Sequence, residues 1–326
     1  MRALRRILVA VADPRARAQP AIVKAMHLAR RSGARVELFH SMFDPLLQGE
    51  RQYGKRWTSR EFDALLQSSR QQLEQRAAEL ANAGARVVCS VQWDYPAHEA
   101  IVRQARRSKA DLVIASTQRR RRLSRLLLAN TDWELIRHCP TPLILVRNAR
   151  PWKGGRILAA IDPMHTHARP SGLDRRILET ATLLSRTLQA QLHAVHAYAP
   201  PIAYVPDFVT GPVAVEVPQG EAREYRRQVR RRVRAETKRF AIGERRVHLV
   251  EGDPAVALPL QARRTRARLV VMGAVSRSVL ARLFIGSTAE RIIDELDCDI
   301  CVVKPAGYRT AVAARAHSLP VMVAPL

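Results

Sequence analysis

The chain repeats itself at a spacing close to half its length of 326 residues. "RRILVAVADP" at 5–14 is similar to "GRILAAIDP" at 155–163, and "DLVIAST" at 111–117 to "RLVVMGA" at 268–274. Further on, "NTDWELI" at 130–136 is similar to "STAERII" at 287–293. The offset stays between about 149 and 158 residues throughout, which indicates two copies of one domain. We place them at 1–148 and 155–305, joined near "NARPWKGG" and followed by a weakly patterned tail at 306–326.

Each copy alternates short apolar runs with segments of helical period. The apolar runs are continuous rather than alternating, as expected for parallel strands covered on both faces. Alternation of this kind predicts a doubly wound parallel sheet. The fold class is therefore α/β, with two tandem doubly wound five-stranded parallel-sheet domains. The predicted strands are 6–12, 35–41, 86–92, 111–116 and 142–147, then 156–162, 190–197, 246–251, 268–273 and 299–304. The predicted helices are 19–32, 59–83, 96–108 and 131–138, then 172–188, 219–241, 254–265 and 287–296.

Composition narrows the class of protein. Apolar residues make up 47% of the chain, so each copy can bury a full core. Four cysteines are too few for a disulfide framework. Cys298 and Cys301 form a C-x-x-C, but "CDICVVKP" reads as a strand, which favours a structural role. The opening "MRALRRILVAV" has too short an apolar run for a signal peptide and no cleavage site, and no run in the chain approaches the ~18 apolar residues of a membrane span. We therefore expect a cytoplasmic protein.

The net charge of +26 comes mostly from arginine spread along the chain. A solvated surface is the simpler interpretation, and an anionic partner is the alternative. Arginines are densest in the segment "RRQVRRRVRAETKR" at 226–239, which has a helical period. As a basic helix it could bind nucleic acid or anionic lipid. It carries no large aromatic residue, and no zinc-finger or RNA-binding motif appears elsewhere.

Doubly wound sheets bind ligands beyond the carboxyl ends of their strands, where the strand order reverses. This rule selects the ends of the first and fourth strands: Asp13 and Ser116 in copy one, Asp162 and Gly273 in copy two. The stretch "GAVSRSVLARLFIGS" at 273–287 follows the fourth strand of copy two. Glycines let a backbone approach phosphate oxygens closely, and a helix N-terminus supplies free N–H donors. Glu290, three residues after Ser287, gives the spacing of a helix capping box, so this segment is equally compatible with a capped helix alone.

At these residues the chain resembles the universal stress protein family. Nucleotide-binding members carry G-x2-G-x9-G-[ST] after strand four and an aspartate after strand one. Copy two has Gly273, Ser276, Gly286 and Ser287 at those spacings, and the family's G-D-P recurs at 252–254. The two-copy layout and "TDW" at 131–133 most resemble the tandem E-type. The resemblance implies the adenine nucleotide alpha hydrolase-like fold.

The resemblance also implies a ligand for copy two, ATP or a related adenine nucleotide, with metal present only as nucleotide-bound Mg. Asp162 would face the adenine. The loop contacts would come from Met272, Gly273, Ser276, Gly286, Ser287 and Thr288. Ser276 departs from the family's second glycine, and left-handed backbone at a serine costs roughly 1 kcal/mol.

Copy one has lost the phosphate cradle. Ser116, Arg119, Ala129 and Asn130 stand at its four motif positions, and none is a glycine. Its run 119–122 of four arginines is either a solvated loop or a side-chain anion site. We expect one nucleotide per chain, in copy two.

Single-copy family members dimerise through their last strand. By resemblance, segments 142–147 and 299–304 would pair within this chain as an internal pseudo-dimer, and a further homodimer is compatible with the sequence. No catalytic motif appears, so we expect a non-enzymatic stress-response protein, with weak ATP hydrolysis left open. A nucleic-acid-associated protein and a ligand-free scaffold are the alternatives.

Histidines near the predicted site complete the list of candidates. His165 and His167 follow Asp162, where a metal is the alternative to a polar loop. His193 and His196 lie three apart on one strand, so we expect them to point to opposite faces and not to share a metal.

Overall fold

The computed structural model describes residues 3–42, 59–82, 84–117, 125–150, 152, 154–164, 172–199, 202–205, 213–216, 218–274 and 287–315. Only the backbone is described at 59–62, 125–130, 202–205, 213–216 and 287. The described residues form two compact units, unit 1 from 1–152 and 307–326, and unit 2 from 153–306.

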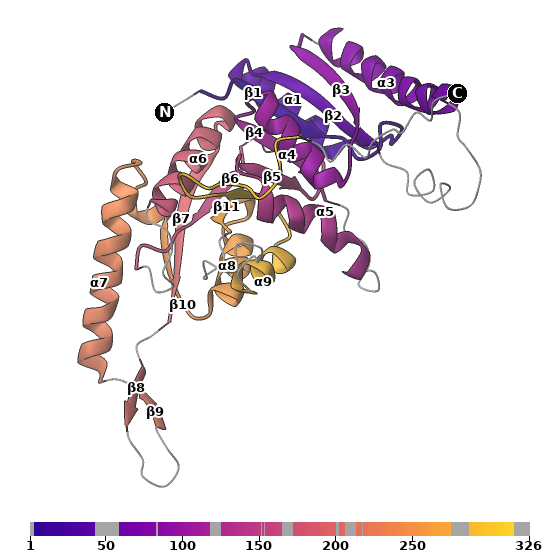
Figure 1. Cartoon of the computed structure of the whole chain (residues 1–326). Coiled ribbons are helices and arrows are strands. Elements are labelled where there is room, and N and C mark those ends of the chain that lie inside the picture. The colour runs from indigo at the N-terminus through magenta and orange to yellow at the C-terminus, as the bar shows by residue number, and fades with distance from the viewer. Residues whose placement is uncertain are drawn as a thin grey trace. The chain divides into compact units, whose positions relative to one another are not determined.

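Unit 1 contains a five-stranded parallel sheet in the order β3-β2-β1-β4-β5 (Figure 1). Its central strands hold the most buried side chains; Ile7, Leu8 and Val9 of β1 are at most 1% exposed. The strands are β1 Arg6–Ala10, β2 Arg35–Met42, β3 Val87–Trp93, β4 Leu112–Ser116 and β5 Leu143–Val146. The helices are α1 Pro20–Ser32, α3 Ser59–Asn82, α4 Ala97–Arg107 and α5 Arg125–His138.

Unit 2 repeats this arrangement, with a parallel sheet in the order β10-β7-β6-β11-β12. The strands are β6 Arg156–Ala160, β7 Gln191–Tyr198, β10 Val247–Glu251, β11 Ala267–Gly273 and β12 Asp299–Val303. The helices are α6 Leu173–Leu188, α7 Gln219–Lys238, α8 Pro254–Arg264 and α9 Ser287–Glu295, with the 3-10 turn η2 Glu244–Arg246 before β10. In both sheets the strand order reverses at the first strand, with the second and third strands on one side and the fourth and fifth on the other, so the switch point lies between the first and fourth strands.

The predicted α/β class and the predicted strands and helices are confirmed, with ends that shift by a few residues. Besides the turn η2, a hairpin in unit 2 was not predicted. Strands β8 Ile202–Val205 and β9 Val213–Glu216 pair antiparallel as a hairpin that projects from the α/β core of unit 2 (Figure 1). Helix α5 also begins at Arg125 rather than 131.

The segment joining the two copies packs on unit 1. Trp152 is 1% exposed, and the Lys24 Nζ of α1 lies 4.4 Å from the centre of its ring, a cation–π contact. The same ammonium group donates to the carbonyl oxygen of Arg150. The described part of the tail packs on unit 1 as well, because the Tyr308 hydroxyl donates to the carbonyl oxygen of Arg137 at 2.5 Å. Among the described residues, no helix is long and apolar enough to cross a membrane.

Candidate functional site

The predicted site lies at the carboxyl edge of the sheet in unit 2. Strands β6 and β11 are parallel neighbours, with Ala159 paired to Val271, so both strands end at the same edge of the sheet. Asp162 follows the end of β6, and Gly273 is the last residue of β11. The register therefore brings these two predicted residues to one edge. Met272 precedes Gly273 within β11 and is 3% exposed, so its side chain belongs to the core.

Asp162 is a buried carboxylate, 8% exposed. Its backbone N–H donates to Oδ1 of Asp174 at 2.9 Å, and its Oδ1 lies 3.8 Å from Nδ1 of His196. Asp174 is buried too and belongs to the first turn of α6. The neighbours Asp174 and His196 were not predicted, because nothing in the sequence indicates that helix α6 returns to the end of β6.

Gly273 is needed for close packing. A Cβ at this position would lie 2.7 Å from Cδ2 of Leu173, closer than Cβ atoms approach their neighbours, and 3.1 Å from its Cγ. Leu173 is the first residue of α6 and is 1% exposed. The absence of a side chain at 273 therefore has a structural cause within this chain, whether or not a ligand binds.

The glycine loop itself lies outside the described residues, and Ser276 and Gly286 lie within that interval. Helix α9 begins at Ser287, and Thr288 follows in its first turn, as predicted. An ion pair of 3.0 Å joins Arg291 of α9 to Asp253, whose Oδ1 also caps α8 by accepting from the N–H of Ala255. Gly252 before it has φ +130, a conformation that only glycine adopts readily.

A buried lysine at this edge escaped the sequence analysis. Lys304 follows β12 and is 5% exposed. Its Nζ donates to the carbonyl oxygen of Ala274 at 2.8 Å and so holds the first residue after β11. A cation directly after the last strand, in a run that reads "CVVKP", is a signal that a search for anion ligands could have used.

Unit 1 differs at the position of Asp162. Strand β1 pairs Ala10 with Phe39, and β6 pairs Ala160 with Val195, so Ala12 corresponds to Asp162. Asp13, the expected counterpart, lies one residue further on and is exposed. Its Oδ1 accepts the N–H of Arg15 at 2.8 Å, which makes it a turn residue. The prediction for Asp13 is corrected: "VADP" has one more residue before its proline than "IDP".

The other motif positions of unit 1 are also filled by the chain's own structure. Ser116 corresponds to Gly273, and its Oγ accepts the N–H of Ala21 at 3.1 Å. Ala129 and Asn130 lie inside α5 rather than at its beginning, since the run "RLLLAN" lacks a glycine and favours helix. The four arginines at 119–122 lie outside the described residues.

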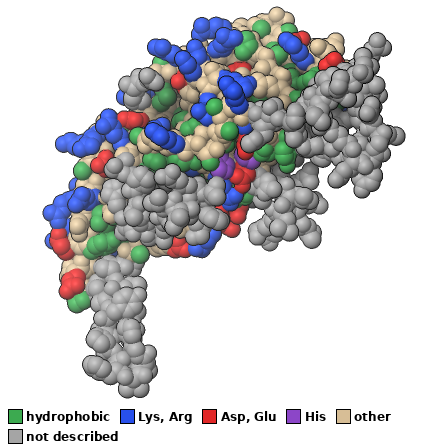
Figure 2. Space-filling view, in the orientation of Figure 1, with side chains coloured by type: hydrophobic (Ala, Val, Ile, Leu, Met, Phe, Trp, Pro, Cys, Tyr) green, Lys and Arg blue, Asp and Glu red, His purple; other side chains and the backbone are tan. Residues whose placement is uncertain are grey.

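The arginine-rich segment forms the exposed face of α7. Among its described residues only Val229, Val233 and Thr237 are buried. Several arginines pair with glutamates: Arg226 with Glu251, Arg227 and Arg231 with Glu224, and Arg234 with Glu244. Basic side chains are scattered over the visible face, with acidic ones among them (Figure 2). These observations favour a solvated surface over a nucleic-acid groove.

The remaining sequence candidates have local explanations. Cys301 is fully buried in β12, and burial raises the pKa of its thiol to about 12, which makes this C-x-x-C structural. His193 and His196 have different partners: His193 Nδ1 lies 3.0 Å from Nε2 of His248, whereas His196 contacts the carbonyl oxygen of Ile161. His165 and His167 lie outside the described residues.

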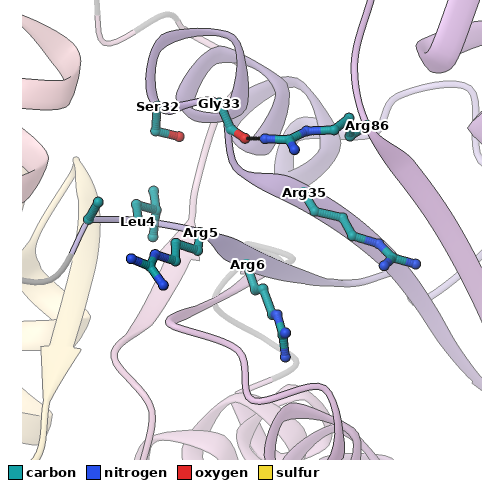
Figure 3. Close-up of a pocket in the computed structure, with 8 residues that line it drawn as sticks. Leu4, Arg5, Arg6, Ser32, Gly33, Arg35 and Arg86 are labelled. Carbon is teal, nitrogen blue, oxygen red and sulfur yellow. Dashed lines mark hydrogen bonds between the residues drawn. The ribbon is translucent and has the colours of Figure 1, made fainter.

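A shallow pocket of about 510 Å³ opens at the amino ends of β1 and β2, away from the predicted site. Four of its lining residues are Arg5, Arg6, Arg35 and Arg86. Their guanidinium groups point in different directions, and Arg86 is hydrogen bonded to the carbonyl oxygen of Gly33 (Figure 3). Guanidinium groups that do not point toward one position do not form a defined binding site for an anion.

Comparison with known proteins matches both halves of the chain. The model of the universal stress protein family matches residues 3–147 and again 155–304. Universal stress protein E of Escherichia coli K12 is 28% identical over 317 residues, which cover 94% of this chain and 96% of that protein. The corresponding protein of Photorhabdus laumondii is 26% identical over 313 residues, 94% of this chain and 97% of its own.

A solved structure has a similar fold over nearly the whole of this chain. The crystal structure of a putative universal stress protein from Pseudomonas aeruginosa has a TM-score of 0.70 and 26% identity, covering 93% of this chain and 94% of that one. The family model, the related sequences and the solved structure each match residues of both units. The chain therefore belongs to the universal stress protein family, with one family domain in each half.

Proposed function

We propose that this chain is a non-catalytic cytoplasmic stress-response protein that binds ATP or a related adenine nucleotide in unit 2 only. The difference between the two carboxyl edges carries the proposal. Unit 2 presents Asp162 and Gly273 at the switch point, whereas unit 1 has Ala12 and Ser116 at the same positions. Of the two switch points in the described residues, only that of unit 2 therefore offers both an acidic acceptor and a bare backbone.

The chemistry of the edge supports a nucleotide. A carboxylate such as that of Asp162 accepts hydrogen bonds from an exocyclic amine like that of adenine. The backbone N–H groups at the start of α9 and the ammonium group of Lys304 are suited to phosphate oxygens. Ser276, Gly286, Ser287 and Thr288 would supply the remaining contacts, with Mg bound through the nucleotide.

Isothermal titration of the full chain with ATP tests the proposal. We expect one binding site per chain in the wild type. Asp162→Asn should weaken binding at least about tenfold, because an amide cannot accept from the adenine amine through both of its polar atoms.

Asp13→Asn is the matched control, since it makes the same change at the exposed turn of unit 1 and should leave binding unchanged. No heat with millimolar ATP, or equal weakening by both substitutions, would contradict the proposal. Mass spectrometry of molecules that co-purify with the native chain identifies the ligand without assuming one.

A further inference from the structure

Two helices of unit 1 bring together three side chains that metals favour. His98 lies in the first turn of α4, and Glu134 and His138 lie one turn apart on α5. One ligand atom from each lies within 4.8 Å of the other two. Helices α4 and α5 lie side by side in unit 1 (Figure 1). No motif in the sequence indicates this cluster, since His98 is far from the other two residues along the chain.

The surroundings hold these side chains in place. The first turn of α4 is fixed by Arg103, whose guanidinium group is fully buried and pairs with Asp94 at 2.7 Å and with Glu99 at 2.7 Å. On α5, Arg137 donates to Oε1 of Glu134 at 2.6 Å. Hydrogen bonds of this kind from an outer residue commonly orient carboxylate ligands.

His138 supplies a second, independent observation. It is 8% exposed, and its Nε2 lies 3.1 Å from Oε2 of Glu134. Its Nδ1 is buried and has no hydrogen-bond partner among the described residues. The ring of His98 stacks on it, with centroids 5.8 Å apart. Buried polar nitrogens normally have partners, so an orphan beside two other ligands needs an explanation.

The same place in unit 2 is built differently. Helices α4 and α8 are capped at their C-termini by Ser108 and Thr265, each followed by a residue with positive φ, so His98 corresponds to Ala255. On the second helix, Leu135 and Ile292 occupy matching positions, so Glu134 corresponds to Arg291 and His138 to Glu295. In unit 2 the bridge between the two helices is the ion pair of Arg291 with Asp253. Unit 1 has exchanged that ion pair for two imidazoles and a carboxylate.

We propose that His98, Glu134 and His138 bind a divalent transition-metal ion of the zinc type, which ties α4 to α5. Two histidines and one glutamate form a known set of three protein ligands for zinc, with the fourth position left to water or to a group from another molecule. Tetrahedral bonds of about 2.0–2.1 Å place ligand atoms roughly 3.4 Å apart, so small side-chain rotations would close the site. The carboxylate offsets part of the cation's charge.

Zinc sulfate is the probe for the test. The full chain, freed of any affinity tag and stripped with EDTA, is titrated with zinc in competition with a chromophoric chelator. We expect one zinc ion per chain at high affinity, and a rise in the thermal midpoint of unfolding as zinc is added. Replacement of zinc by cobalt should give the visible absorption of a four-coordinate site.

Variants locate the site. His98→Ala and Glu134→Gln should each weaken zinc binding by more than about 100-fold, because losing a ligand costs more than losing an outer partner. Alanine stands at the corresponding position of unit 2, so His98→Ala is compatible with the fold. His248→Ala is the control, as it removes a histidine of the other close pair and should leave zinc affinity unchanged. No tight zinc binding by the wild type, or loss on His248→Ala with retention on His98→Ala, would overturn the proposal.

Discussion

Replacing Gly273 with alanine should destabilise unit 2 without any ligand being involved. The new Cβ would lie 2.7 Å from Cδ2, 3.1 Å from Cγ and 3.3 Å from Cδ1 of Leu173, three atoms of one side chain. Leu173 is 1% exposed, so its side chain can move away only by displacing other buried atoms. Overpacking of this kind costs about 1–3 kcal/mol of the free energy of unfolding.

Leu173→Ala removes the obstacle and tests that cause. By itself it should cost about 2–5 kcal/mol, since it leaves a cavity. In the double variant, the methyl group at 273 enters space that Leu173 has vacated. We therefore expect Gly273→Ala to cost under about 0.5 kcal/mol in that background, a coupling of at least about 0.5 kcal/mol.

Urea unfolding followed by far-UV circular dichroism measures these free energies. Fluorescence cannot replace it, because Trp57, Trp93, Trp133 and Trp152 all precede unit 2. Gly243→Ala is the matched control, since its added Cβ meets only a side-chain nitrogen at 3.9 Å and its φ is −65. Equal costs for Gly273→Ala with and without Leu173 would refute the packing argument.

Further predictions concern charge, thiols and the loop. Burial, and then the neighbouring His248, lowers the pKa of His193 to about 4 from 6.5, so the native state favours the neutral ring. The free energy of unfolding should therefore fall as pH drops from about 6.5 toward 4, because the unfolded state binds the proton more readily, and His193→Phe should flatten that slope in urea titrations across that range. Arg103→Ala should cost about 3–5 kcal/mol in the same assay, because it leaves the buried carboxylate of Asp94 without its cation; unchanged stability would contradict this. Cys301 should resist thiol reagents in the native chain and react only after urea is added, as mass spectrometry of labelled peptides would show. Ser276→Gly should tighten ATP binding roughly fivefold, in line with about 1 kcal/mol of backbone strain relieved; weaker binding in calorimetry would show that the hydroxyl is a ligand.

The sequence by itself determined the architecture of this protein. Continuous apolar runs that alternate with helical segments predict a parallel sheet covered by helices on both faces. Because the pattern occurs twice in the chain, it predicts two such sheets. The same patterns placed Asp162 and Gly273 at one edge, since the carboxyl ends of parallel strands lie together. These conclusions hold because the buried positions of a strand or a helix recur at a regular spacing, and that spacing can be seen in the order of apolar residues along the sequence.

Only the tertiary structure decided what surrounds those residues. Pairing register showed that Asp13 lies one residue beyond the position of Asp162, a difference that alters every contact because successive residues point to opposite faces. The conflict between Gly273 and Leu173 and the meeting of His98 with Glu134 and His138 also appeared only there. Such contacts join segments far apart along the chain, and they depend on helix lengths and registers that residue patterns specify only to within a turn.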